Sequence, residues 1–152
     1  MTKEELKIKL TELFPAATFD ESGEWLNINI TPADFSSFMD TLRNKVELSF
    51  DYMFCLTCID WKTHLTMVYH LESTTYRHQL VVKAQLDRNK PEIETVSHIW
   101  RTAEFHEREV YELFGVNFLN HPDLRLLILP DGWEGKNPLR KDFEDPVNMI
   151  KL

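Results

Sequence analysis

The sequence predicts an α+β fold, in which a mixed or antiparallel sheet packs with a few helices and an irregular, proline-rich C-terminal tail follows. Three observations support this prediction. Apolar residues recur at helical spacing in several segments, and they alternate with polar residues in others, as in half-buried strands. After Gly115, proline dipeptides interrupt any regular pattern. We therefore expect a core over residues 1–115 and a tail over residues 116–152 that belongs to the same domain unit.

The first forty-odd residues predict two helices with a hairpin between them. Thr2 and Glu5 form a capping-box pattern before a helix over residues 3–14. Residues 17–20 and 24–30 read as a hairpin. A second helix is expected to begin at the Thr-Pro pair of residues 31–32, and its apolar face consists of Phe35, Phe38, Met39 and Leu42.

The middle of the chain predicts three strands and two further helices. The strands are expected near residues 49–59, 65–72 and 77–86, and the last two suit an antiparallel hairpin. A short helix is expected over residues 95–100. A longer one is expected over residues 103–114, where Gly115 serves as the C-cap.

Charge and composition narrow the possible functions. The 152 residues, 43% of them hydrophobic, have the size and balance of one globular domain. A net charge of −8 without a Lys/Arg block argues against nucleic-acid binding and against an anionic lipid surface. No apolar stretch approaches the ~18 residues of a membrane span. The N-terminus lacks the pattern of a secretory signal, so we expect the chain to stay in the cytoplasm.

Motifs for common cofactors are missing from the sequence. Its four glycines cannot form a dinucleotide-binding or phosphate-binding loop, which argues against a nucleotide or flavin site on this chain. The stretch from His106 to Val110 begins like the zinc motif H-E-x-x-H, but valine cannot bind the metal at the second ligand position. We therefore expect no metalloprotease site.

Cys55 and Cys58 form a C-x-x-C pattern with two possible meanings. They are either half of a zinc, iron–sulfur or redox site, or two buried cysteines that act as small hydrophobic residues. The chain has no further cysteines for a cluster, and the surrounding residues read as a core strand. The second interpretation is therefore favoured. The rival is a free-standing metal or redox enzyme that uses both cysteines and His64.

The helix over residues 103–114 is rich in charge. Glu104 and Glu112 lie four residues on either side of Arg108, so both are placed to form ion pairs with it. Paired carboxylates also serve in acid–base catalysis. We favour a solvated, salt-bridged helix face over that catalytic role.

The tail combines aromatic, arginine and aliphatic residues on an irregular backbone. Trp, Tyr and Arg are the residue types that anchor protein interfaces. The run from Asp123 to Arg125, Trp133 and the run from Leu139 to Phe143 fit such a role. A tail that folds on its own domain fits the same pattern, and the residues alone leave both possibilities open.

Residues 107–116, EREVYELFGV, followed by Phe118 and the HPDLR run of residues 121–125, resemble the signature of a known family. It is the 30-kDa subunit family of respiratory complex I, called the C subunit of NADH:quinone oxidoreductase in bacteria. Residues 129–135, LPDGWEG, and 138–143, PLRKDF, resemble the family's closing segment. Gly132, Glu144 and one additional residue near 136–137 depart from the family pattern, which leaves the local path of the tail open.

The resemblance implies a role within an assembly. It implies a structural subunit in the hydrophilic arm of a proton-translocating NADH:quinone oxidoreductase, with no activity in isolation and no bound cofactor. FMN and iron–sulfur clusters are expected on partner subunits. The chain is expected to pack against the quinone-site D subunit and near the iron–sulfur subunits, peripherally on the cytoplasmic side of the inner membrane. A related subunit of a membrane-bound hydrogenase-type complex is the alternative.

No catalytic, cofactor-binding or metal-binding residue is assigned to this chain. The residues predicted to contact partners are Glu107, Arg108, Glu109, His121, Asp123, Arg125, Trp133, Arg140, Lys141 and Asp142. Among them, Arg108, Arg125 and Arg140 are expected to make charge-assisted hydrogen bonds that fix the register of the contact.

Overall fold

The computed structural model describes residues 1–150 of the chain, so the last two residues of the predicted tail lie outside it. Its helices are α1 (Lys3–Leu13), α2 (Pro32–Asn44) and α3 (Ala103–Phe114). Its strands are β1 (Thr18–Asp20), β2 (Asn27–Ile30), β3 (Tyr52–Asp60), β4 (His64–Glu72), β5 (Gln79–Asp87), β6 (Glu92–Glu94) and β7 (Asn117–Leu119).

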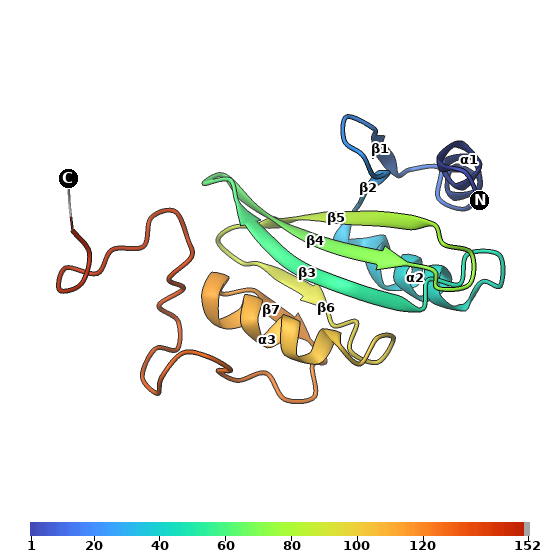
Figure 1. Cartoon of the computed structure of the whole chain (residues 1–152). Helices are drawn as coiled ribbons and strands as arrows, with labels where there is room; N and C mark the ends of the chain where they lie inside the picture. The colour runs from blue at the N-terminus through green and yellow to red at the C-terminus, as the bar shows by residue number, and fades with distance from the viewer. Residues whose placement is uncertain (151–152) are drawn as a thin grey trace.

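The main sheet has five strands in the order β1-β2-β5-β4-β3 (Figure 1). The β2–β5 pair is parallel, whereas the other neighbours are antiparallel, so the sheet is mixed and the predicted α+β class is confirmed. The parallel pair arises because the chain leaves β2, forms α2 and the β3–β4 hairpin, and returns beside β2 as β5. This route makes β3 an edge strand.

One face of the sheet packs against α2, which lies behind it in Figure 1. The predicted apolar face of this helix, Phe35, Phe38, Met39 and Leu42, is fully buried. The ring of Phe35 lies 5.1 Å from the ring of Tyr69 in β4. The inward residues of the strands, spaced by two, complete the core because successive side chains of a strand point to opposite faces.

The second layer of the core is built at the β3 edge, where α3 packs and the short parallel pair β6–β7 lies beside it (Figure 1). Burial of Ile93 and Phe118, the central residues of these two strands, joins the pair to the core. The sequence did not predict this pair, because a three-residue strand with one apolar residue shows no alternation to recognise. β7 also lies within the range predicted as an irregular tail.

The prediction of a helix over residues 95–100 is wrong. This segment closes a single turn, in which the carbonyl of Val96 accepts from the amides of Ile99 and Trp100. One turn is too short to overcome the entropic cost of starting a helix. The indole N–H of Trp100 instead donates to the carbonyl of Phe50 and fixes the segment to the core.

The predicted boundaries of the other helices are confirmed within two residues. Thr2 and Glu5 exchange both hydrogen bonds of the capping box. Gly115 ends α3 with φ 77°, a left-handed conformation that costs glycine least. No helix within residues 1–150 has the length and apolar character needed to cross a bilayer.

Candidate interaction surface

The chain after β7 runs back along α3, and the helix holds its backbone. The guanidinium of Arg108 donates to the carbonyl of Arg125 at 3.1 Å and to that of Leu126 at 2.6 Å. Arg108 is only 8% exposed. Hydrogen bonds to a charged donor are stronger than neutral ones, so this side chain fixes the path of the segment.

Glu112, one turn further along α3, holds the next residues of the same segment. Its carboxylate accepts from the amides of Leu127, Ile128 and Leu129 at 2.8, 2.9 and 3.2 Å. Three successive amides that converge on one anion form a compact anion-binding concavity. The carboxylate is buried, and these three amides supply hydrogen bonds to its oxygens.

This arrangement leaves the side chains of the segment available. Because α3 binds only backbone groups of residues 125–129, the apolar side chains can face outward. Leu127 is 39% exposed and Ile128 is 66% exposed, and the ring of Phe105 on α3 is also exposed. We call the segment from Leu124 to Leu129 the apolar strip. Fixed, exposed apolar groups of this kind mark interaction surfaces.

A second cluster fixes the tail further along the chain. The carboxylate of Asp60, at the end of β3, accepts two bonds from Arg88 at 3.0 and 2.9 Å and one from the amide of Lys141 at 2.8 Å. Arg88 also pairs with Asp142 at 2.9 Å. The hydrogen bonds from Arg88 lower the pKa of Asp60, which therefore stays ionised.

Between the two clusters, the tail crosses the C-terminal end of α3. The amide of Leu139 donates to the carbonyl of Leu113, and the guanidinium of Arg140 donates to that of Phe114 at 2.7 Å. The side chain of Asn137 lies so close to Gly115 that an added Cβ there would stand 2.6 Å from it. A glycine is therefore required at position 115 for two reasons. The backbone angle there favours glycine, and the tail passes too close for a side chain.

The interpretation of α3 as a solvated, salt-bridged face is wrong. Glu107, Arg108 and Glu112 are all buried. Arg108 and Glu112 bond to the backbone of the tail in place of the ion pairs expected within the helix. A pattern of charges on a helix shows which side chains share a face, but not that the chain returns to cover that face. The tail does fold on its own domain over this part.

The predicted contact residues divide into two groups. Glu107, Arg108 and the side chain of His121 are buried, and they bond within the chain. Arg140 is half-buried and also bonds within the chain. The exposed group consists of Glu109, Asp123, Arg125, Lys141 and Asp142.

Two of the exposed residues, Asp123 and Arg125, pair with each other at 3.0 Å. Trp133 is half-buried, with the ammonium of Lys136 4.5 Å from its ring and the ring of Phe143 6.4 Å from it. These side chains form the outer surface of the folded tail.

Three structural residues, Asp60, Arg88 and Glu112, were not predicted as tail anchors. Asp60 ends β3 and Arg88 follows β5, so both charges stand at the end of a core strand. A charged residue at the end of a core strand is the signal that could have identified them. Nothing in the sequence shows that Lys141, 81 positions after Asp60, donates to it.

The cysteines lie on β3, where their separation by three residues directs them to opposite faces of the sheet. Cys58 is buried, as predicted, whereas Cys55 is only partly buried, and both are free thiols. Burial raises the pKa of Cys58 to about 12, so its thiol stays protonated. Two thiols on opposite faces cannot converge on one metal ion.

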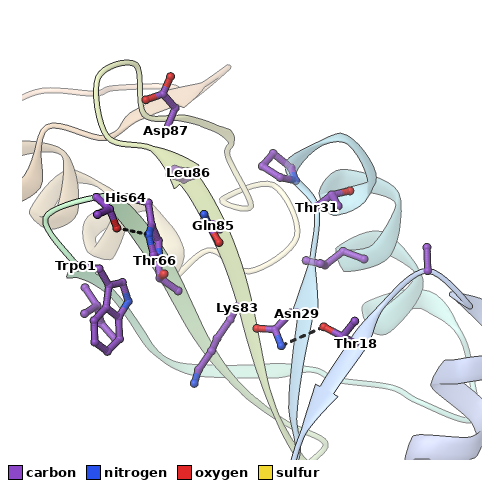
Figure 2. Close-up of a pocket in the computed structure, with 15 residues that line it drawn as sticks. Thr18, Asn29, Thr31, Trp61, His64, Thr66, Lys83, Gln85, Leu86 and Asp87 are labelled. Carbon is purple, nitrogen blue, oxygen red and sulfur yellow. Dashed lines mark hydrogen bonds between the residues drawn. The ribbon is translucent and has the colours of Figure 1, made fainter.

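The sheet face opposite α2 carries a shallow groove. Figure 2 shows Trp61, His64 and Lys83 projecting from three segments of this face, with Asn29 and Gln85 beside them. The rings of Trp61 and His64 stack, and the lining mixes neutral polar side chains with apolar ones. Within residues 1–150, no three His, Cys, Asp or Glu side chains cluster so that they could hold a metal ion.

The sequence is similar to subunits of several respiratory complexes. It is 46% identical over 104 residues to the C/D subunit of NADH-quinone oxidoreductase of Phocaeicola vulgatus, which covers 67% of this chain and 20% of that protein. It is 42% identical over 105 residues to the C subunit of NADH-quinone oxidoreductase of Chloroherpeton thalassium. That alignment covers 68% of this chain and 43% of that protein. It is 43% identical over 102 residues to the C subunit of F(420)H(2) dehydrogenase of Methanosarcina mazei. That alignment covers 66% of this chain and 65% of that protein.

Two solved structures share the fold. A chain of the membrane-bound sulfane sulfur reductase, described as an archaeal respiratory membrane complex, aligns with a TM-score of 0.80 and 29% identity over 93% of this chain and 85% of that one. The trypsin-resistant fragment (1-134) of Nqo5 aligns with a TM-score of 0.71 and 24% identity over 81% of this chain and all of that one. At this identity, the second match shows the fold alone.

The matched region spans less than half the length of the first two relatives. Residues 28–147 match the family described as the 30 Kd subunit of respiratory-chain NADH dehydrogenase. The match includes both tail-fixing clusters and the apolar strip. The chain therefore belongs to the family of the 30-kDa subunit of respiratory-chain NADH dehydrogenase.

Proposed function

We propose that this chain is a structural subunit of the hydrophilic arm of a proton-translocating NADH:quinone oxidoreductase, and that it packs against the quinone-site D subunit. The observation that carries the proposal is the apolar strip, whose backbone is bound by Arg108 and Glu112 while Leu127 and Ile128 remain exposed. Buried charges that fix an exposed apolar segment prepare it for contact with another protein.

The relatives support the choice of partner. The protein of Phocaeicola vulgatus is named as a C/D subunit, so a segment similar to this chain and the D subunit belong to one polypeptide there. Direct packing of the two units is the simplest arrangement for such a fusion. On this proposal, the chain itself binds no flavin or iron–sulfur cluster and has no activity alone. FMN and the clusters belong to neighbouring subunits, and the assembly holds the chain at the cytoplasmic side of the membrane.

The test is co-purification of the tagged chain from membranes of its native host in mild detergent. The test variant is the double substitution Leu127→Ser and Ile128→Ser, and the control is Val46→Ser, which changes an even more exposed apolar residue before β3. We expect the wild type and the control to recover the D subunit with the flavin and iron–sulfur subunits. We expect the double variant to lose them, together with NADH:quinone activity. Full recovery with the double variant contradicts the assignment of the strip.

A second candidate is the same structural role in a related complex, such as a membrane-bound hydrogenase-type assembly. The similarity to the C subunit of F(420)H(2) dehydrogenase and to a chain of the sulfane sulfur reductase supports it, because both names describe other redox assemblies. The same co-purification separates the two. A nickel-containing large subunit in place of NADH-oxidising subunits assigns the chain to the second.

A further inference from the structure

Glu107 is a fully buried carboxyl group without a cationic partner. Its Oε1 atom accepts from the amide of Val96 at 2.8 Å, and its Oε2 atom is 2.5 Å from the hydroxyl of Thr95. Within residues 1–150, no Lys or Arg side chain forms an ion pair with it. A buried carboxylate that only neutral groups solvate is costly, which favours its protonated form.

The side chain of His121 lies beside Glu107 and is also buried. Its Nδ1 atom accepts from the amide of Asp123 at 3.0 Å, and a ring nitrogen that accepts a hydrogen bond carries no proton. The Nε2–H group donates to the carbonyl of Glu104 at 2.9 Å and lies 3.7 Å from Glu107 Oε2. The imidazole therefore links residues 121–123 to the first turn of α3.

The other elements around Glu107 add no positive charge. Burial is the main cause that raises the pKa of Glu107 to about 7, and the charges of Glu94 on β6 and Glu104 on α3 act in the same direction. Tyr69 on β4 has a buried hydroxyl without a hydrogen-bond partner, and the charge of Glu107 helps to raise the pKa of that phenol. The hydrogen bonds from Thr95 and Val96 act in the opposite direction, but burial outweighs them, so the protonated form of Glu107 is favoured relative to an ordinary glutamate.

We propose that Glu107 and His121 form a buried proton-binding pair, and that loss of the carboxyl proton loosens the attachment of residues 121–123 to α3. In the protonated form of the pair, the proton resides on the carboxyl group of Glu107. When it leaves to solvent, the carboxylate draws the Nε2–H group away from the carbonyl of Glu104. Closing the 3.7 Å separation requires a ring shift on the order of 1 Å. That shift withdraws Nδ1 from the amide of Asp123.

The consequence concerns the start of the tail. Residues 121–123 immediately precede the apolar strip. The protonation of Glu107 therefore determines how strongly the start of the strip is attached to α3. The proposal rests on the contacts inside this chain and stands whether or not the D subunit is the partner.

The test is an NMR titration of the full chain between pH 5 and pH 9, with the Glu107 carboxyl carbon and the Asp123 amide resolved. We expect both signals to change with a common midpoint near pH 7. In Glu107→Gln, the transition at the Asp123 amide should disappear. Glu109→Gln, which alters an exposed residue of the same helix, should retain it.

Unfolding in urea gives a second measurement. A carboxyl whose folded pKa is raised from 4.5 to about 7 contributes stability at low pH that is lost as pH rises through this window. Relative to Glu107→Gln, the folding equilibrium constant of the wild type should fall on the order of a hundredfold between pH 5 and pH 8. Titration of Glu107 near its ordinary pKa, or a transition at Asp123 that persists in Glu107→Gln, overturns the proposal.

Discussion

The two clusters that hold the tail use opposite parts of it. On α3, Arg108 and Glu112 bind carbonyl and amide groups of residues 125–129, and the side chains of Leu127 and Ile128 remain exposed. At the end of β3, Asp60 and Arg88 bind the amide of Lys141 and the carboxylate of Asp142, which occupies a tail side chain. The first cluster thus leaves two apolar side chains exposed, whereas the second uses a side chain of the tail to hold the tail in place.

This difference separates structural residues from contact residues within one motif. Arg108 and Glu112 belong to the part of the sequence most similar to the family, yet they face inward. Their role is to position Leu127 and Ile128. The residues of a family signature can therefore be those that prepare a surface, while the residues that touch a partner lie next to them in space.

The largest effect on the free chain is expected from Glu112→Ala. Removing the carboxylate leaves the three amides of residues 127–129 without their acceptor at a partly buried site. We expect a loss of about 3 kcal/mol in the free energy of unfolding, measured in urea. Glu109→Ala, at an exposed position of the same helix, should change it by less than about 0.5 kcal/mol. Equal effects of the two substitutions would remove the distinction between the buried and exposed faces of α3.

Asp60→Asn tests the second cluster, and its effect should depend on pH. At neutral pH we expect a loss of about 3 kcal/mol, because Arg88 loses its buried anion. Since the folded pKa of Asp60 is lowered, its contribution is present above the ordinary value of ~3.9 and is lost as pH falls below it. The wild type and the variant should therefore converge in stability on acidification below about pH 4, as followed by thermal unfolding.

Gly115→Ala tests the crossing between the clusters. The added Cβ meets Asn137, and the left-handed backbone angle is strained for alanine. We expect a loss of about 1–2 kcal/mol in urea unfolding. Combining the substitution with Asn137→Gly removes the steric part and should recover some of that loss. If the second substitution recovers nothing, the tail does not cross Gly115 as described.

The smallest effect on the free chain is expected from Arg125→Ala. Its side chain is 71% exposed and pairs only with Asp123, so thermal unfolding of the isolated chain should not change measurably. Recovery of partner subunits from membranes should fall, because an exposed arginine beside the apolar strip is placed to bond across an interface. Unchanged recovery and unchanged NADH:quinone activity would exclude Arg125 from the contact.

Sequence reasoning reached most of the fold because its signals are local. Thr2 with Glu5, Gly115 and the apolar face of α2 each determine a helix end or a buried face within a few residues. The strands β3, β4 and β5 were expected from strand-like sequence over residues 49–86, but the parallel pairing of β2 with β5 was not. The short pair β6–β7 and the single turn after Thr95 could not be predicted in this way, because distant contacts determine them.

The candidate surface was predicted in composition but not in arrangement. The charges of α3 and the arginines of the tail were recognised, yet the bonds of Arg108, Glu112 and Arg140 connect residues separated by 15 to 52 positions. Whether Arg108 faces water, a partner or its own chain depends on the return of the tail. The path of the tail depends on the whole fold, so the spacing of residues within α3 cannot predict it.

Hydrogen exchange of the amides of Leu127, Ile128 and Leu129 in the isolated full chain tests whether α3 holds the apolar strip before any partner binds. If it does, the Glu112 carboxylate protects these amides despite the exposure of the side chains of Leu127 and Ile128. We predict exchange slowed by at least about tenfold relative to an unstructured chain, and loss of this protection in Glu112→Ala. Exchange at the unstructured rate in the wild type contradicts this arrangement, because the strip would then gain its structure only from a partner.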